Sequence, residues 1–253
     1  MASYFSSIGF PLSTLEQFDD LVEQVLPLTH SQQSGRSSQR VWASDCGAEI
    51  VVKETPHEVH GLSPGFVGQS LNSIRIHEFV AREWSCVSPF EGALVGWLEP
   101  DEDDPDSGEC QIIFNIADDA KYRHLSLDTP FTTRAQISAF AIDVTLYPNE
   151  AAFEEEQDGG RNFTFAPQSL VPLGLLGFDD SLLQQPSSRV LLNGHVLQSE
   201  IHTNALTGEI YYWVLLQSLG GSFDVLIDPK LCSCLPPVGC ILSSTSFLVG
   251  RVS

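Results

Sequence analysis

Three cysteines near the end of the chain have a spacing that invites metal chemistry. Cys232, Cys234 and Cys240 form a C-x-C-x5-C pattern, and thiolates are good zinc ligands. A structural zinc site usually has four ligands and C-x2-C spacing, so the fourth ligand would come from elsewhere, from His195 or His202. We therefore name Cys232 and Cys234 as candidate metal ligands. The alternative is that these thiols pack in a loop, because their neighbours are leucine and proline.

A second candidate metal site is the histidine pair His57 and His60, which lies close to Glu54 and other acids. Histidines three residues apart share one face of the chain if the segment forms a helical turn. In that case His57, His60 and the nearby acids would serve a metal-dependent enzyme. Pro56 and Pro64 favour a loop instead, and the alternative is then a solvated pair of side chains.

The most acidic run of the chain covers residues 101–109, and hard cations such as calcium bind clustered oxygen ligands. The spacing does not match an EF-hand loop, so we interpret the run as a charged hairpin tip that resists edge-to-edge pairing. The chain has neither a G-x-S-x-G nucleophile motif nor a G-K-[ST] phosphate loop. We therefore expect no cofactor, and leave open whether the protein is an enzyme.

The charge balance narrows the choice of partners. The chain has 12 Lys and Arg against 33 Asp and Glu, which gives a net charge of −21 at pH 7. A surface of this sign repels nucleic-acid phosphates and anionic lipid head groups, so we expect no membrane partner and disfavour nucleic acid. A protein or a small cationic ligand fits better. The alternative is that the acidity serves only solubility.

One helix is predicted near the start of the chain. Ser13 and Glu16 match a capping box, in which a hydroxyl caps the helix and a carboxylate follows three residues later. Apolar residues then recur at helical spacing from Leu15 to Val25, and Pro27 ends the helix. We expect the apolar stripe to dock on a sheet, the alternative being a partner-binding helix. The Ser- and Gln-rich residues 30–40 are predicted to form a linker or mobile loop.

Alternating apolar residues predict strands through the rest of the front part. These strands cover residues 48–54, 73–84, 92–98, 111–116 and 136–147, although residues 132–135 are also compatible with a helix start. The acidic residues 149–160 indicate a boundary, which divides the chain into one domain at residues 1–165 and another at 166–253. Only six of the 33 acidic residues fall in the second domain, so the acidity belongs to the first.

The last third of the chain contains five predicted strands, at residues 189–201, 209–217, 222–228, 238–244 and 247–252. Gly194 inside the first strand indicates a bulge or bend, and Gly220 with Gly221 indicates a tight turn. A long bent strand, a meander, a crossover and two closing strands resemble the OB-fold, a small five-stranded barrel. The expected fold is mostly β: an acidic antiparallel β-rich N-terminal domain with one N-terminal helix, followed by a five-stranded OB-like β-barrel.

The resemblance implies a ligand face on the second and third strands of the barrel. Alternation places Tyr211 and Trp213 on one face of the second strand and Tyr212 on the other. Nucleic-acid binders of this fold combine stacking aromatics with basic residues, and this part of the chain has few of the latter. Tyr211, Trp213 and His195 are our candidate ligand-binding residues. The alternative is that one aromatic face is core and the other covers the seam with the first domain.

The start of the chain has no basic segment followed by an apolar run, and the longest apolar runs are shorter than the ~20 residues of a membrane helix. We expect a cytoplasmic protein with six reduced cysteines. Our hypothesis is a non-enzymatic binding or protein-interaction module that uses the barrel or the interdomain seam. The alternatives are a metal-dependent enzyme and a single-stranded nucleic-acid binder, and homo-oligomer formation is left open.

Overall fold

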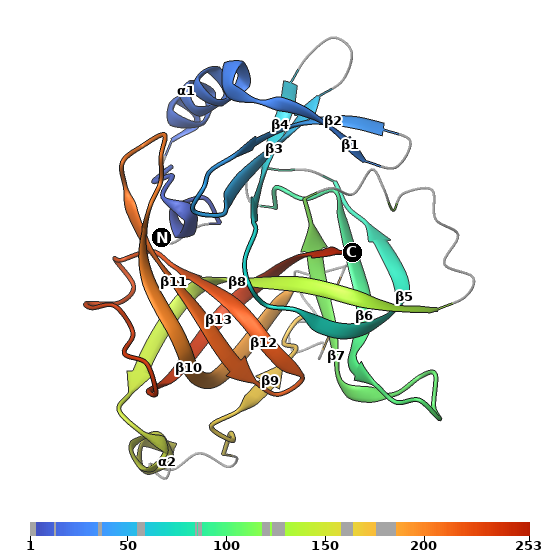
Figure 1. Cartoon of the computed structure of the whole chain (residues 1–253), viewed down its shortest axis with the longest axis vertical. Coiled ribbons are helices and arrows are strands. Elements are labelled where there is room, and N and C mark those ends of the chain that lie inside the picture. The colour runs from blue at the N-terminus through green and yellow to red at the C-terminus, as the bar shows by residue number, and fades with distance from the viewer. Residues whose placement is uncertain are drawn as a thin grey trace.

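The computed structural model describes residues 4–12, 14–34, 37–54, 59–83, 85, 88–117, 122, 130–157, 164–175 and 186–253. Most of these residues lie in strands, which confirms the mostly β prediction (Figure 1). The strands form a four-stranded sheet and a nine-stranded sheet. Among the described helices, none has the length and apolar character needed to span a membrane.

The small sheet has the order β1-β2-β3-β4, and all its neighbouring strands are antiparallel. Its strands are β1 (His30–Ser34), β2 (Ser37–Ala43), β3 (Ala48–Glu54) and β4 (Val59–Phe66). The predicted linker at residues 30–40 is therefore wrong, because residues 30–34 and 37–40 lie in the paired strands β1 and β2. A polar composition suits β1 because this strand lies at the edge of the sheet and pairs on one side only.

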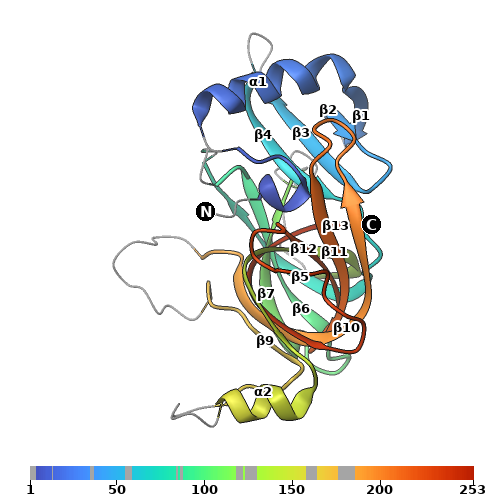
Figure 2. The same cartoon turned by 90° about the vertical axis from the view of Figure 1, so that its left-hand side faces the viewer.

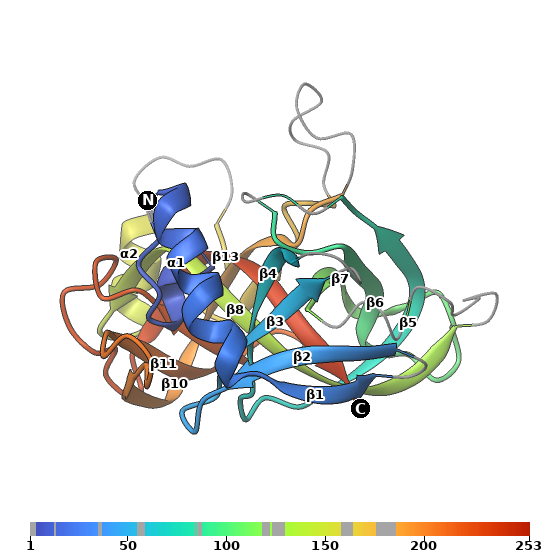
Figure 3. The ribbon, with the colours of Figure 1, turned by 90° about the horizontal axis from the view of Figure 1, so that it is seen from above.

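The predicted N-terminal helix is confirmed as α1 (Leu15–Val25), which a short 3-10 helix extends through Leu26–Leu28. The residue that caps it is Thr14, whose hydroxyl accepts a hydrogen bond from the backbone N–H of Gln17 at 3.2 Å. Viewed from above, α1 and the small sheet lie together over the large sheet (Figure 3). The apolar stripe of α1 docks on the small sheet as expected. Its buried residues Leu21 and Val25 belong to the same core cluster as Val41, Trp42 and Ile50 of that sheet.

The large sheet contains all the remaining strands. They are β5 (Asn72–Ala81), β6 (Gly92–Pro100), β7 (Gly108–Ile116), β8 (Phe131–Tyr147), β9 (Ser169–Val171), β10 (Arg189–Thr203), β11 (Ile210–Ser218), β12 (Gly221–Ile227) and β13 (Ile241–Val252). The predicted pairing of β6 with β7 across the acidic tip is confirmed. The alternative of a helix start at residues 132–135 is wrong, because these residues already belong to β8.

The pairings of the large sheet form two circuits that share β8 and β13. One runs β10–β11–β12–β8–β13 and returns to β10, and the other runs β5–β6–β7–β13–β8 and returns to β5. Because β8 precedes residue 165 and its partners β12 and β13 follow it, strands from both predicted domains lie in one sheet. The division at residue 165 itself stays a prediction.

An OB-like barrel built from the last third alone is not confirmed. Four strands of the large sheet come from this region instead of the five predicted, because residues 241–252 form the single strand β13. The predicted gap at residues 245–246 lies inside this strand, where Ser244 and Ser246 are buried and hydrogen-bond to each other at 2.9 Å. The pairing of β13 with β8 continues through them with one irregularity in register.

A second helix, α2 (Glu150–Gln157), lies in the acidic stretch that was predicted to be a boundary. Asn149 begins it by accepting a hydrogen bond from the backbone N–H of Ala152 at 2.9 Å. A single turn of 3-10 helix, η1 (Ser6–Ile8), lies near the other end of the molecule against β11. The described chain therefore has more helix than the one N-terminal helix expected.

Two large core clusters lie on opposite faces of β11. Tyr212 belongs to the cluster inside the large sheet, whereas Tyr211 and Trp213 belong to the cluster that includes the small sheet and α1. The predicted alternation of these three side chains is confirmed. The face that carries Tyr211 and Trp213 is therefore the seam between the two sheets.

Candidate functional site

A pocket of about 430 Å³ opens at this seam, above the hairpin formed by β10 and β11. Its walls come from three parts of the chain: the β2–β3 turn at residues 44–47, the segment 66–69 that begins with the last residue of β4, and the side chains of Glu200, His202 and Trp213. Pockets of this volume are typical of small-molecule sites.

The hairpin register explains why these side chains meet. Glu200 lies opposite Trp213, and His202 lies opposite Tyr211. Residues directly opposite each other point to the same face of an antiparallel pair, and so do residues two apart on one strand. All four side chains therefore face the small sheet, which closes the pocket on the other side.

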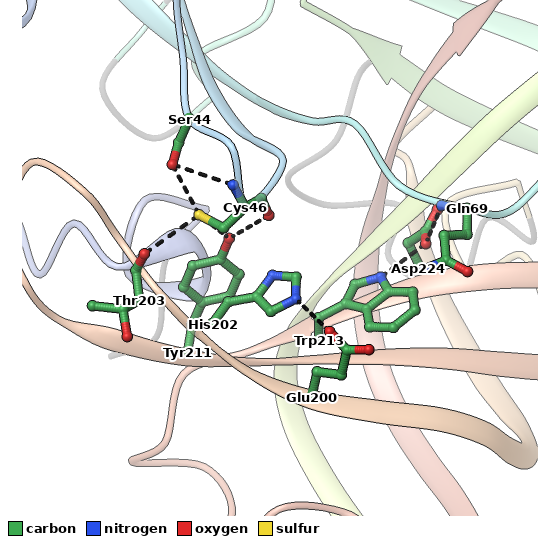
Figure 4. Close-up of polar contacts among 9 residues, drawn as sticks. All are labelled: Ser44, Cys46, Gln69, Glu200, His202, Thr203, Tyr211, Trp213 and Asp224. Carbon is green, nitrogen blue, oxygen red and sulfur yellow. Dashed lines mark hydrogen bonds and ion pairs between the residues drawn. The ribbon is translucent and has the colours of Figure 1, made fainter.

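The aromatic rings form one wall of the pocket (Figure 4). The His202 ring stacks on Trp213 with their centroids 5.8 Å apart and their planes at 11°. Tyr211 meets the other side of His202 edge-on at 5.4 Å, and Phe66 approaches at 6.3 Å. The rings of Tyr211, Trp213 and Phe66 are almost completely buried, so the wall has a fixed position.

Below this wall, the buried carboxylate of Asp224 holds several parts of the pocket together. One oxygen accepts hydrogen bonds from the indole N–H of Trp213 at 2.9 Å and the backbone N–H of Gln69 at 2.8 Å. The other accepts from the backbone N–H and hydroxyl of Ser70 and from the amide of Gln136, at 2.7–3.0 Å. This carboxylate fixes the position of the 66–69 wall relative to β11.

The close approach of this wall requires a glycine. A Cβ atom on Gly68 would lie 2.1 Å from the carboxyl carbon of Asp224, which is far inside normal contact distance. Any larger residue at position 68 would therefore displace either the wall or the carboxylate. The glycine is explained by packing against the hydrogen-bond network below the pocket.

The pocket is electrostatically one-sided. Asp45 and Glu200 contribute carboxylates, and among the described lining residues there is no lysine or arginine. Glu200 remains 60% exposed and lies 3.3 Å from Nε2 of His202, so one of its oxygens is available at the mouth. Carboxylates attract cations through their charge. The lining therefore suits a positively charged group.

Cys46 lies at one end of the pocket in a network of hydroxyl groups. Its sulfur is 3.0 Å from Oγ of Ser44 and donates to the carbonyl of Thr203 at 3.4 Å. The hydroxyl of Tyr211 donates to the backbone carbonyl and the sulfur of Cys46 at 3.0 and 3.2 Å. Burial and, to a lesser extent, the neighbouring thiol raise the pKa of Tyr211 well above its usual value.

This arrangement does not activate Cys46 as a nucleophile. An activated thiol needs a base within hydrogen-bonding reach, and the described contacts of the sulfur are hydroxyl and carbonyl groups instead of the imidazole of His202. The groups that the pocket presents are the carboxylates of Asp45 and Glu200 beside a fixed aromatic wall.

The structure brings two of the three predicted ligand-binding residues to this pocket. Trp213 lines it, and Tyr211 supports it from the same strand. His195 lies further back along β10, where its Nε2 is 3.0 Å from Glu150 at the start of α2. The ligand-binding role of all three stays a prediction.

Of the predicted metal ligands, His60, Cys232 and Cys234 lie apart from the pocket. His57 lies outside the described residues. The ring of His60 is 3.3 Å from Glu91, whose other oxygen is 3.9 Å from the ammonium group of the buried Lys53. A neighbouring cation opposes metal binding at His60.

Cys232 and Cys234 lie in the loop after β12, where the thiol of Cys232 donates to the carbonyl of Cys234 at 3.0 Å. Burial raises the pKa of Cys232, which opposes the thiolate form that metals bind. Within the described ranges, no three His, Cys, Asp or Glu side chains are grouped so as to hold a metal ion. The metal ligands, including His57, stay a prediction.

The comparisons with known proteins add no assignment, since no protein-family model, no curated protein and no solved structure matches the chain.

Sequence reasoning did not identify Glu200 as part of this site, nor Asp45, Cys46 and Asp224, and it considered His202 only as a distant metal ligand. A signal for two of them exists in the hairpin. Strands were predicted at residues 189–201 and 209–217, and counting back along both strands from the turn between them places Glu200 and His202 beside the aromatic pair.

Proposed function

We propose that the protein is a binding module that holds a cationic group, an ammonium or guanidinium, in the pocket above the β10–β11 hairpin. The observation that carries the proposal is the pocket lining, which combines Asp45 and Glu200 with the aromatic wall of His202, Trp213 and Phe66. The group can belong to a small ligand or to the side chain of a protein partner.

The overall charge supports the same ligand class. A chain with a net charge of −21 attracts cations over distances comparable with the Debye length of about 8 Å at physiological salt. The buried rings beside the carboxylates of Asp45 and Glu200 keep the wall of the pocket in a fixed position, so a cation meets a preorganised site. The same charges disfavour nucleic acid as a ligand.

Isothermal titration calorimetry with choline tests the proposal, and 3,3-dimethyl-1-butanol is a neutral molecule of nearly the same shape. We expect choline to bind with a Kd on the order of 1 mM at low salt, and the neutral alcohol to bind far more weakly. Glu200→Gln should weaken choline binding roughly threefold to fivefold, about 1 kcal/mol, because it removes the carboxylate at the mouth.

Glu155→Gln on α2 is the matched control, since Glu155 is exposed and the substitution makes the same change in net charge away from the pocket. Equal weakening by the two variants would show that only the overall charge matters. That result, or equal affinity for the neutral alcohol, would reject the pocket as a cation site.

We also infer that the circuit of β10, β11, β12, β8 and β13 corresponds to the OB-like barrel that the last third of the sequence suggested. Its support is the β10–β11–β12 meander together with β8, which pairs with both β12 and β13. In this interpretation, β8 supplies the closing strand that the last third lacks. An experimental structure that shows the circuit open between any two of these strands would reject it.

A further inference from the structure

The last part of β10 forms an open edge of the large sheet beside the pocket. The first part of the strand pairs with β13 and β9, but from Gln198 to Thr203 its partner among the described strands is β11 alone. Figure 2 shows this end of β10 at the margin of the molecule. Backbone groups on an open edge are available to another strand.

The hairpin hydrogen bonds show which backbone groups face outward. The N–H of Asn204 donates to the carbonyl of Glu209 at 2.8 Å, so this pair closes the ladder next to the turn. Hydrogen-bonded and non-hydrogen-bonded pairs alternate along an antiparallel ladder. Glu200 is therefore hydrogen-bonded to β11, whereas the N–H and C=O groups of Ser199 and Ile201 point away from it.

Both ends of this outward edge are already occupied within the described chain. At one end, Val196 exchanges backbone hydrogen bonds with Gly239 and Cys240 at 2.8 and 3.0 Å. At the other end, the carbonyl of Thr203 accepts from the thiol of Cys46. The edge between them, at Ser199 and Ile201, has the length of a short extended segment.

We propose that an extended peptide segment of a basic partner adds to this edge of β10 and places an arginine or lysine side chain in the pocket. This inference rests on the proposed function, because the pocket receives the cation. A residue opposite Glu200 on the added strand would form a non-hydrogen-bonded pair, in which side chains approach most closely. Its side chain would point to the face on which Glu200 and His202 line the pocket.

The other face of the edge suits the neighbouring residues of such a segment. Ile201 is 56% exposed, although it lies in a well-formed strand. On an added strand, the residues on either side of the basic one point to the same face as Ile201. The recognised pattern is therefore apolar, basic, apolar, with backbone hydrogen bonds to Ser199 and Ile201.

Charge favours this occupant over a second copy of the chain. Two copies paired along this edge would bring their Glu200 side chains close together and join two molecules with a net charge of −21 each. Like charges opposite each other destabilise strand pairing. A basic segment instead gains from both the local carboxylates and the overall charge.

The test is fluorescence anisotropy with a labelled pentapeptide, acetyl-Thr-Val-Arg-Val-Thr-amide, and three matched probes. These are the peptide with norleucine in place of arginine, the peptide with both valine nitrogens methylated, and acetylarginine amide as a competitor. We expect the parent peptide to bind at least tenfold tighter than acetylarginine amide. The norleucine peptide should lose that gain because it lacks the positive charge, and the N-methylated peptide should lose it because it lacks the backbone N–H donors.

Ser199→Pro removes the outward N–H without removing a hydrogen bond to β11, and Ser199→Ala is the control that keeps it. Ser199→Pro should weaken the peptide at least tenfold, Ser199→Ala less than twofold, and neither should change binding of acetylarginine amide. Equal peptide binding by the two variants, or by the N-methylated peptide, would overturn the proposal.

A wild-type dimer in sedimentation analysis that Ser199→Pro dissociates would also overturn it, because the edge would then be covered by a second copy. Failure of the proposed function shows separately, as the absence of any binding of acetylarginine amide to the wild-type protein.

Discussion

Replacing Asp224 by asparagine tests whether one buried carboxylate holds the pocket together. The carboxylate accepts five described hydrogen bonds, two on one oxygen and three on the other. Asparagine has a donor group in place of one oxygen, so in either orientation at least two donors would face another donor. Hydrogen bonds to charged groups contribute roughly 1.5–3 kcal/mol each, so we expect Asp224→Asn to destabilise the protein by about 3–6 kcal/mol.

Urea denaturation followed by circular dichroism measures this free energy of unfolding. Asp228→Asn is the matched control, because Asp228 is also buried but its side chain accepts one described hydrogen bond, from the N–H of Lys230 at 3.0 Å. We expect the control to lose about 1 kcal/mol. A loss at Asp224 within 1 kcal/mol of that at Asp228 would refute the reasoning, because the five hydrogen bonds would then contribute no more than one.

Three further predictions concern packing and ionisation. Gly68→Ala should lower the free energy of unfolding by about 3 kcal/mol in the same urea denaturation assay, because its methyl group would clash with Asp224. Gly208→Ala is the control, since Gly208 has a φ of +75° but open space around it, and it should lose about 1 kcal/mol. Burial raises the pKa of Tyr211, so its neutral form is favoured in the folded state and stability should fall as the pH rises above 10. Tyr211→Phe should cost about 1 kcal/mol at pH 7 but make that alkaline decline shallower, and an unchanged slope in urea titrations at pH 10–11.5 would contradict this. Burial and, to a lesser extent, the nearby Glu109 raise the pKa of Cys110 to about 11. Iodoacetamide at pH 8 should therefore modify the exposed Cys234 of the native protein but leave Cys110 intact, as measured by mass spectrometry. Rapid modification of Cys110 would contradict its burial.

Much of the strand pattern could be predicted because the buried faces alternate. The strand at residues 48–54 and the pairing of β6 with β7 follow from apolar periodicity and turn residues alone. The predictions were wrong where a strand contains many polar residues. β1 is polar because it lies at an edge, and β13 contains buried serines that satisfy each other, so neither carries the usual apolar signal.

The site could be predicted only in part. Strand alternation and the hairpin turn are local signals. They place Tyr211 and Trp213 on one face of β11, and they are enough to place Glu200 and His202 on the same face of the hairpin. The opposite wall comes from a turn more than 150 residues earlier, and its position depends on how the small sheet packs on the hairpin. The hydrogen-bond network of Asp224 joins β12 to the segment 66–69 and to β8. Its partners are far apart in the sequence, so the spacing of neighbouring residues could not predict it.

The central claim is that the pocket recognises positive charge, and the indole N–H of Trp213 is a direct reporter of it because Trp213 lines the pocket. Its resonance in a ¹H–¹⁵N correlation spectrum, assigned with Trp213→Phe, should shift saturably as choline is added. We expect no saturable shift with 3,3-dimethyl-1-butanol, and none with choline in the Asp45→Asn, Glu200→Gln double variant. An equal shift with the neutral alcohol, or a choline shift that survives in the double variant, would contradict the account.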